Sequence, residues 1–315
     1  MGFGTEAESI EAVLVSVAEV PLARKAVERA SQGEKTKDLL FKSALLLSLS
    51  VGFIALGVLI VDVLIDAGSR ISPELITKYP SQVFPEESGV RSALLGTLLL
   101  MLTTALFIVP VGVATAVYLE EYADGQRWWN RFIELNIQNL AAVPSVVYGI
   151  LGLAFIVRSP LSLGSVILAG ALTLGLLVLP VVIVVSREAI RAVPPSIREG
   201  SMALGATHWQ TIWKQTLPGA LPGIATGVIL ALSRAIGETA PLIVIGGGAF
   251  ILNDPSLNVA DGQFTALPLL IFNFISESDE QLRIAGAAAI IVLLAVLLVM
   301  NAGAVYLRNR YEQKW

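Results

Sequence analysis

Two side chains of opposite charge, Arg234 and Glu238, lie four residues apart within an apolar stretch that runs from Pro222 to about Ile251. On an α-helix this spacing puts both on one face, about 6 Å apart along the axis. Arg234 stands 12 residues after Pro222, near the middle of a helix long enough to cross a membrane. An arginine there costs ~2.5–3.5 kcal/mol and normally faces a bundle interior or a water-filled path. The pair either fixes helix packing or lines a pathway; charge within a membrane favours the pathway, and a guanidinium suits an oxyanion.

A long polar interval, Arg187–Gln215, comes directly before this stretch. Pro194-Pro195-Ser196 is expected to end the preceding helix, and Ser196 to cap a short new one. Glu199 is then the third residue past the cap, in the capping-box position. The pattern predicts a short helix that begins at this cap.

Gly205 permits the left-handed backbone of a sharp turn out of that helix. A second short helix is predicted over Ala206–Lys214, ended by Leu217-Pro218. Trp209 and Trp213 share one face of it, where they would pack against a membrane or a partner. The interval is therefore expected to be two short helices along a membrane surface, next in sequence to the charged stretch.

The composition of the chain indicates which class of fold must position these residues. Of 315 residues, 55% are hydrophobic and only 15% are charged, and the mean hydropathy is +0.76. The apolar residues form long runs, so we expect an all-α, polytopic membrane protein. The chain has no cysteine, which excludes disulfides and thiolate chemistry, and its net charge of −4 provides no basic surface for nucleic acid.

Six runs are long enough to span a bilayer. They are Ser43–Val61, Ala93–Leu119, Leu140–Val157, Leu163–Val185, Pro222–Ile251 and Ile284–Leu307. Glu120–Gln138 is expected to be a polar loop that holds Trp128 and Trp129 at the interface. Phe264–Ile275 is too short to cross, which predicts an interfacial or re-entrant piece. Residues 1–38 form a tail that is either an amphipathic helix or a partly ordered solvated segment, and 39–315 form the transmembrane domain.

Six spans place both termini on one side of the membrane. Fifteen Lys and Arg fall on that side: six before Ser43, two in the second loop, four between Arg187 and Lys214, and three at the end. Five fall on the other side. The positive-inside rule therefore predicts that both termini and the Arg187–Gln215 interval are cytoplasmic.

The polar interval is similar to a known motif. Glu199, Gly205, Leu217 and Pro218 match the spacing of the EAA loop of ABC importer permeases. In that family the loop, here about 187–218, forms a coupling helix that docks on the cytoplasmic ATPase. This sequence departs from the usual pattern at Gly200 and Ser201, normally Ala-Ala, and at Gln215, normally Ile. The resemblance implies a type I importer permease fold with a coupling role for a set of loop residues: Glu199, Gly200, Ser201, Ala203, Gly205, His208, Leu217 and Pro218.

A second motif narrows the family. Arg234-Ala-Ile-Gly-Glu238-Thr-Ala-Pro241 resembles the PstA permease family of phosphate ABC importers. Two further stretches are similar to the same family, Ser186–Pro194 and Phe264–Pro268. The resemblance covers about residues 90–310 and leaves the tail aside.

This resemblance implies a permease subunit for inorganic phosphate. Its implied partners are a PstC-like second permease, two copies of a PstB-like ATPase and a PstS-like phosphate-binding protein outside the cell membrane. Arg234 and Glu238 are the positions expected on the pathway. Arg187, at the cytoplasmic end of the fourth span, is either a further pathway residue or a positive-inside anchor.

The sequence gives little support for a metal site, an enzyme activity or a cofactor. His208 has no second ligand nearby, so we expect no metal site and instead a loop residue that touches the ATPase. No Walker A pattern occurs, and Gly246-Gly247-Gly248 lacks its Lys-Ser/Thr, so no enzyme activity or cofactor is expected in this chain. A permease for another oxyanion, a stand-alone secondary transporter or channel, and a membrane scaffold or sensor remain as alternatives.

Overall fold

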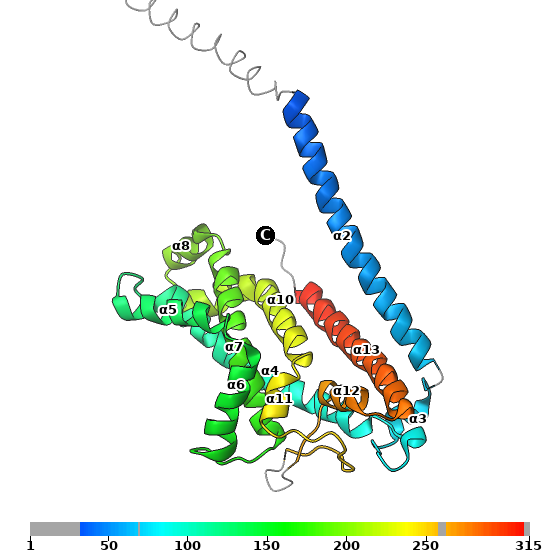
Figure 1. Cartoon of the computed structure of the whole chain (residues 1–315). Helices are drawn as coiled ribbons and strands as arrows, with labels where there is room; N and C mark the ends of the chain where they lie inside the picture. Colours follow the sequence, from blue (N-terminus) through cyan, green and yellow to red (C-terminus); the bar gives the residue numbers. More distant parts are fainter. Residues whose placement is uncertain (1–31, 69, 258–262, 312–315) are drawn as a thin grey trace, which may run out of the picture. The chain divides into compact units, whose positions relative to one another are not determined.

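The structure, a computed structural model, describes residues 32–68, 70–257 and 263–311 (Figure 1). Every regular element in those ranges is helical, which confirms the predicted all-α class. The chain divides into two compact units, 1–62 and 63–315, and the boundary falls inside α2 (Gln32–Ala67). The tail prediction concerns mainly residues 1–31, which lie outside the described residues.

The described part of the first unit is the long apolar helix α2. Every side chain from Thr36 to Asp62 is exposed. A helical stretch that is apolar all round and exposed along this length needs lipid or another protein around it. Its composition therefore agrees with the first predicted span.

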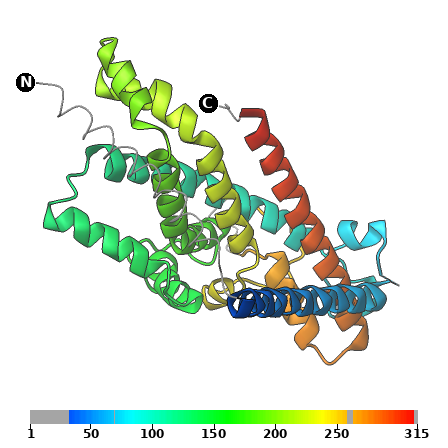
Figure 2. The same ribbon diagram turned by 90° about the horizontal axis from the view of Figure 1, so that it is seen from above.

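The second unit is organised around three helices that pack side by side: α4 (Arg91–Val117), α7 (Ile167–Arg191) and α10 (Leu217–Ile236). Small residues let α7 and α10 come close, since a Cβ on Gly227 would lie 2.5 Å from Cγ1 of Val185. Leu174, Val178 and Ala231 are completely buried at the centre of this packing. The fourth long helix, α13 (Glu280–Tyr311), runs beside α10 in both views (Figures 1 and 2).

The predicted polar loop after the second span is largely helical. Short η2 (Tyr118–Tyr122) continues α4 as a π-type turn, and α5 (Trp128–Leu140) follows. A break that contains Pro144 then bends the chain by 110° into α6 (Ser145–Leu151) and η3 (Gly152–Arg158). The helix after this break therefore begins at Ser145 and not at the predicted Leu140, because the backbone before a proline is disfavoured in the helical region.

Short elements complete the end of this unit that lies away from α5 and α8 (Pro195–Ala203) (Figure 1). They are α3 (Pro73–Thr77), η1 (Pro85–Glu87), α11 (Ala240–Val244) and α12 (Leu267–Ser276). Helix α12 corresponds to the predicted short piece, and it packs against α13 and α4. Phe264 and Phe274 are fully buried, so much of this segment is enclosed by protein.

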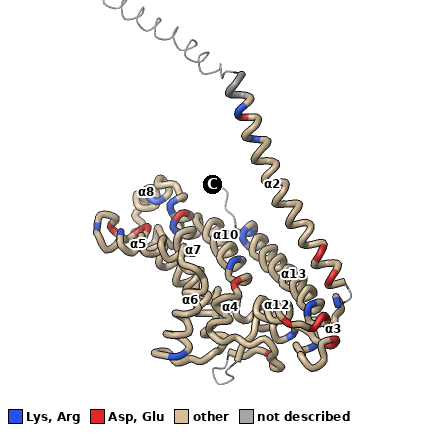
Figure 3. The backbone as a smooth tube through the Cα atoms, in the orientation of Figure 1, with Lys and Arg blue, Asp and Glu red and all other residues tan. Residues whose placement is uncertain are grey.

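Five helices within the described residues are long and apolar enough to span a membrane, and the bent pair α5–α6/η3 would make a sixth. Charged residues gather around α5 and α8 (Pro195–Ala203) at one end of the second unit and around α3 at the other (Figure 3). Long apolar helices with charge at both ends are the pattern of a polytopic membrane protein.

Candidate translocation and coupling site

Arg234 and Glu238 form an ion pair across the end of α10. Nε of Arg234 lies 3.5 Å from Oε1 of Glu238. The helix stops at Ile236 and Gly237 caps it, so Glu238 lies beyond the helix and not on one continuous face as predicted. The predicted continuation of this span to Ile251 is also wrong, because Gly237 and Pro241 interrupt the helix.

The position of Arg234 suits its charge. It stands in the last turn of α10, where the helix dipole favours a cation. The Arg234 side chain is 44% exposed and that of Glu238 is 20% exposed, so this chain encloses the pair on one side only. The arrangement leaves guanidinium donors available to an anion that approaches from outside the chain.

Two hydrogen bonds between polar side chains join α10 to α13, one of them at Ser233, the residue before Arg234. Oγ of Ser233 is 2.7 Å from Oδ1 of Asn301, and Nη1 of Arg308 donates to Oγ1 of Thr226 at 3.3 Å. Sequence reasoning missed Asn301, although an asparagine inside an apolar run is a detectable signal. These hydrogen bonds hold α13 against the helix that carries Arg234.

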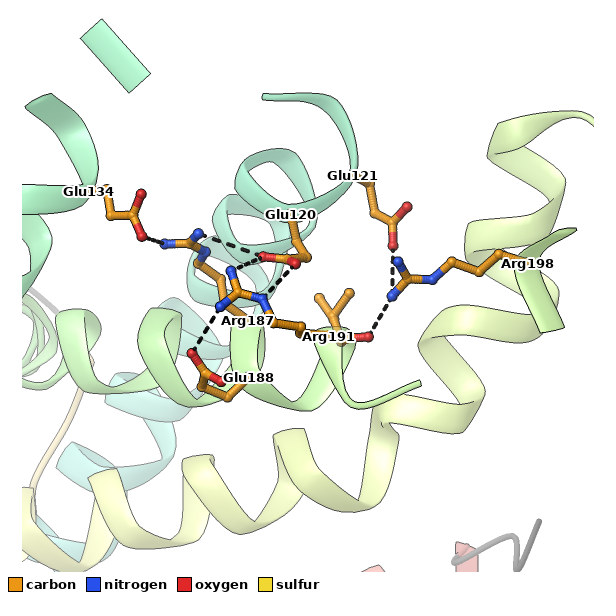
Figure 4. Close-up of polar contacts among 8 residues, drawn as sticks. Glu120, Glu121, Glu134, Arg187, Glu188, Arg191 and Arg198 are labelled. Carbon is orange, nitrogen blue, oxygen red and sulfur yellow. Dashed lines mark hydrogen bonds and ion pairs between the residues drawn. The ribbon is translucent and has the colours of Figure 1, made fainter. Parts of the chain in front are cut away.

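Arg187 lies in a different cluster. Its guanidinium is 2.9 Å from Glu134 on α5 and 3.6 Å from Glu120 on η2, and its side chain is 13% exposed (Figure 4). No ion pair or hydrogen bond among the described residues joins it to Arg234 or Glu238. These contacts hold α5 and the end of α4 on α7.

The first helix of the polar interval begins earlier than predicted. Helix α8 starts at Pro195 with Pro194 as its N-cap, and no side chain caps it, so the predicted cap at Ser196 is wrong. Pro195 is suited to the first position, because its φ is already helical and it has no N–H to leave unpaired. Glu199 is therefore not a capping-box residue; it lies exposed on α8.

A capping box does occur, at the start of the second helix. The backbone N–H of Gln210 donates to Oγ1 of Thr207, and the backbone N–H of Thr207 donates to Oε1 of Gln210. It starts α9 (His208–Thr211). Gly205 has φ +88° between the two helices, which confirms the predicted left-handed turn.

The second helix does not end at Leu217-Pro218 as predicted. From α9 the chain continues through the π-type turn η4 (Ile212–Thr216) directly into α10. Pro218 falls in the first turn of α10, where a proline is tolerated. His208–Ile236 therefore forms one continuous helical path from the loop to Arg234.

The residues predicted for coupling fall into two groups. Leu217 packs with Ile190 and Val193, and Ser201 shares a hydrogen bond of 2.9 Å with Thr211. Pro218 is half-buried. The others are exposed, namely Glu199, Gly200, Ala203, Gly205 and His208.

An exposed surface surrounds the turn between the two short helices. Leu204, at the turn, is 92% exposed. A groove of about 450 Å³ lies beside it, lined by Ser196, Ile197, Gly200, Ser201, Leu204, Ala206, Gln210, Lys214 and Gln215. Trp209 and Trp213 contact each other edge to face and are more than half exposed. A loop with this much exposed apolar surface is suited to contact a partner.

His208 also contacts its own chain. Its Nε2 lies 3.4 Å from Oε2 of Glu121, and its ring packs on the edge of Tyr122. In the described part of the chain no group of His, Asp and Glu is placed to hold a metal ion.

The fold and the loop define a class of protein. Residues 108–313 match the family described as "Binding-protein-dependent transport system inner membrane component", and the chain belongs to this family. It has the type I ABC importer permease fold. The permease chain of a bacterial alginate ABC transporter matches with a TM-score of 0.66 at 18% identity, over 90% of this chain and 98% of that one.

Similar proteins from three organisms indicate which members of this family the chain resembles. The chain is 38% identical to "Phosphate transport system permease protein PstA 1" of Mycobacterium tuberculosis, over 72% of this chain and 73% of that protein. It is 33% identical to "Phosphate transport system permease protein PstA" of Yersinia pestis, over 67% and 70%. A probable PstA protein of Methanocaldococcus jannaschii is 31% identical, over 72% and 77%.

Proposed function

We propose that this chain is the membrane-spanning permease subunit of an ATP-driven importer of inorganic phosphate. The substrate is that named for its relatives in Mycobacterium tuberculosis and Yersinia pestis. The structural observation that carries the proposal is the Arg234–Glu238 pair at the end of α10. A guanidinium held by a carboxylate is a charged group that a phosphate can contact through its remaining donors.

The exposure of this pair supports a pathway made by two subunits. Since the Arg234 side chain is 44% exposed on its own chain, another surface has to close the site against lipid. A PstC-like permease is the proposed second wall. Two PstB-like ATPase subunits and a PstS-like binding protein on the outer side complete the proposed complex.

The continuous helix from the loop to Arg234 supports the coupling mechanism. ATP binding closes the ATPase subunits, and this moves α8 and α9. Because His208–Ile236 is one helical path, the movement reaches the Arg234–Glu238 pair and exposes it to one side of the membrane or the other. We place the complex in the cell membrane, with the loop and both termini in the cytoplasm.

Copurification tests the composition of the complex. A tagged form of the chain, extracted in mild detergent, should bring down a second permease, an ATPase with a Walker A motif and, in the presence of phosphate, an extracytoplasmic binding protein. A tagged form with the α8–α9 segment 195–211 deleted is the control, and it should lose the ATPase. Recovery of the chain as a homo-oligomer with no ATPase would contradict the proposal.

A further inference from the structure

Glu121 places a carboxylate inside the protein at the end of α4. It belongs to η2, and its side chain is only 5% exposed. A buried carboxylate is costly unless cationic or hydrogen-bonding groups surround it. The identity of its partners therefore shows what the residue holds in place.

Both partners come from the coupling loop. Oε1 of Glu121 lies 3.4 Å from Nη2 of Arg198 on α8, and Oε2 lies 3.4 Å from Nε2 of His208 on α9. One carboxylate thus contacts each of the two short helices. Tyr122, the next residue along, packs its ring against the edge of the His208 imidazole and reinforces the second contact.

Arg198 extends the attachment to a third helix. The Nη2 group that faces Glu121 also donates to the backbone carbonyl of Ile190 at 2.6 Å (Figure 4). Ile190 is in the last turn of α7, where carbonyls have no partner within the helix. The guanidinium therefore links α8 to the ends of α4 and α7 together.

The neighbouring glutamate makes different contacts. Glu120 accepts two hydrogen bonds from Arg191, at 2.9 and 3.0 Å, and also faces Arg187 (Figure 4). These arginines are on α7, whereas the partners of Glu121 are on the loop. Glu120 and Glu121, which are consecutive on η2, therefore attach the end of α4 to two different parts of the protein: Glu120 contacts α7 and Glu121 contacts the loop.

We propose that Glu121 is a positioning residue for coupling, which ties both short helices to the end of α4 through Arg198 and His208. A displacement of the loop then reaches α4, and through Arg198 the end of α7, as well as α10, so the three packed central helices move together. This inference rests on the proposed function for its role in transport.

The first test measures the attachment alone. In Glu121→Gln the side chain keeps its size but loses its charge, so amide hydrogen exchange in residues 195–211 should become faster in the purified complex without ATP. Glu188→Gln is the matched control, because Glu188 is exposed and, among the residues that the structure describes, its ion pair is with Arg191 alone. Unchanged exchange in Glu121→Gln would overturn the proposal whether or not the protein carries phosphate.

The second test measures coupling in the complete complex. Glu121→Gln and Arg198→Lys should each lower the amount of phosphate imported per ATP hydrolysed by about threefold or more, with the subunits still assembled. The double variant should lose less than the two single effects combined, since both single variants remove the contact between Glu121 and Arg198. A wild-type ratio in both single variants would overturn the proposal.

The outcomes separate this inference from the proposed function. If the wild-type complex imports no phosphate, the proposed function fails, while the hydrogen-exchange result still decides the attachment. If Glu121→Gln does not assemble, Arg198→Lys supplies the same comparison, because a lysine keeps the charge but lacks the Nη2 group that pairs with Glu121 and donates to the carbonyl of Ile190.

Discussion

The guanidinium of Arg234 lies 3.5 Å from the carboxylate of Glu238, and the glycine that ends α10 stands between them in sequence. The pair therefore joins a rigid helix to the turn that follows it. A change in the position of α10 would change the geometry of the pair. This relationship links the loop at one end of the helical path to the proposed substrate contact at the other.

Removal of the Arg234 guanidinium should nearly abolish transport. A hydrogen bond to a charged group contributes about 1.5–3 kcal/mol, so Arg234→Ala should reduce phosphate uptake roughly ten- to hundredfold. Uptake of radioactive phosphate by the complete complex measures this. Arg158→Ala, which removes an exposed arginine at the end of η3, should leave uptake unchanged. Equal uptake in the two variants would remove Arg234 from the pathway.

The turn at Gly205 should be sensitive to any side chain. With φ +88°, a β-branched residue there is strained by about 1–3 kcal/mol, so Gly205→Val should uncouple ATP hydrolysis from uptake. Gly303→Ala is the control, because Gly303 lies inside α13, an added Cβ there would meet no atom within 4 Å, and alanine favours a helix. The ratio of ATP hydrolysed to phosphate imported distinguishes them. A normal ratio in Gly205→Val would mean that the turn does not transmit the movement.

Close packing of α7 and α10 should limit the size of residue 227. Gly227→Leu would force its side chain against Val185, and overpacking of this kind costs about 1–3 kcal/mol. The thermal unfolding midpoint in detergent should fall by several degrees. Gly303→Leu on α13, where an added Cβ would meet nothing within 4 Å, should change it little. Equal midpoints would show that the two helices do not pack this closely.

Asp254 lies in the connection between α11 and α12, and its carboxylate is bound by Arg91 and Tyr79. Arg91 donates two hydrogen bonds to it, at 2.7 and 3.0 Å, and Tyr79 donates a third. The Arg91 guanidinium holds the pKa of the Asp254 carboxyl below its ordinary value, and the hydrogen bond from Tyr79 lowers this pKa further. The attachment is therefore complete above the ordinary pKa of an aspartate and is lost as the pH falls through the lowered value.

Asp254→Asn should release this attachment at neutral pH. The protection of residues 251–257 against hydrogen exchange, taken relative to the intrinsic exchange rate at each pH, should fall and should no longer change with pH in the acid range. Glu74→Gln, which removes an exposed ion pair with Lys78 outside this segment, is the control. Exchange that stays slow in Asp254→Asn would show that the ion pair does not hold the segment.

Periodicity and composition were sufficient for the long helices. Apolar runs of membrane length have few alternatives, so the spans around α4, α7 and α13 were predicted from sequence. The turn at Gly205 was also predictable, because few residues other than glycine adopt its backbone conformation. The ends of the fifth span were not, since Pro218 continues a helix while Gly237 stops one.

The charged contacts could not be predicted in the same way. Glu121 and Arg198 are far apart in sequence, and a single sequence contains no signal that pairs them. His208 was expected to touch the ATPase, and no sequence pattern indicated that its ring also lies beside Glu121 and Tyr122. Such contacts depend on how α4, α7 and the loop pack together, which local patterns do not specify.

The proposed function is tested most directly by phosphate uptake into proteoliposomes that contain the complex copurified with this chain. We predict that uptake requires both ATP on the side of the ATPase subunits and the binding protein on the opposite side, and that excess sulfate does not compete. Phosphate flux through this chain without an ATPase, or ATP-driven import of a different oxyanion in its place, would contradict the account.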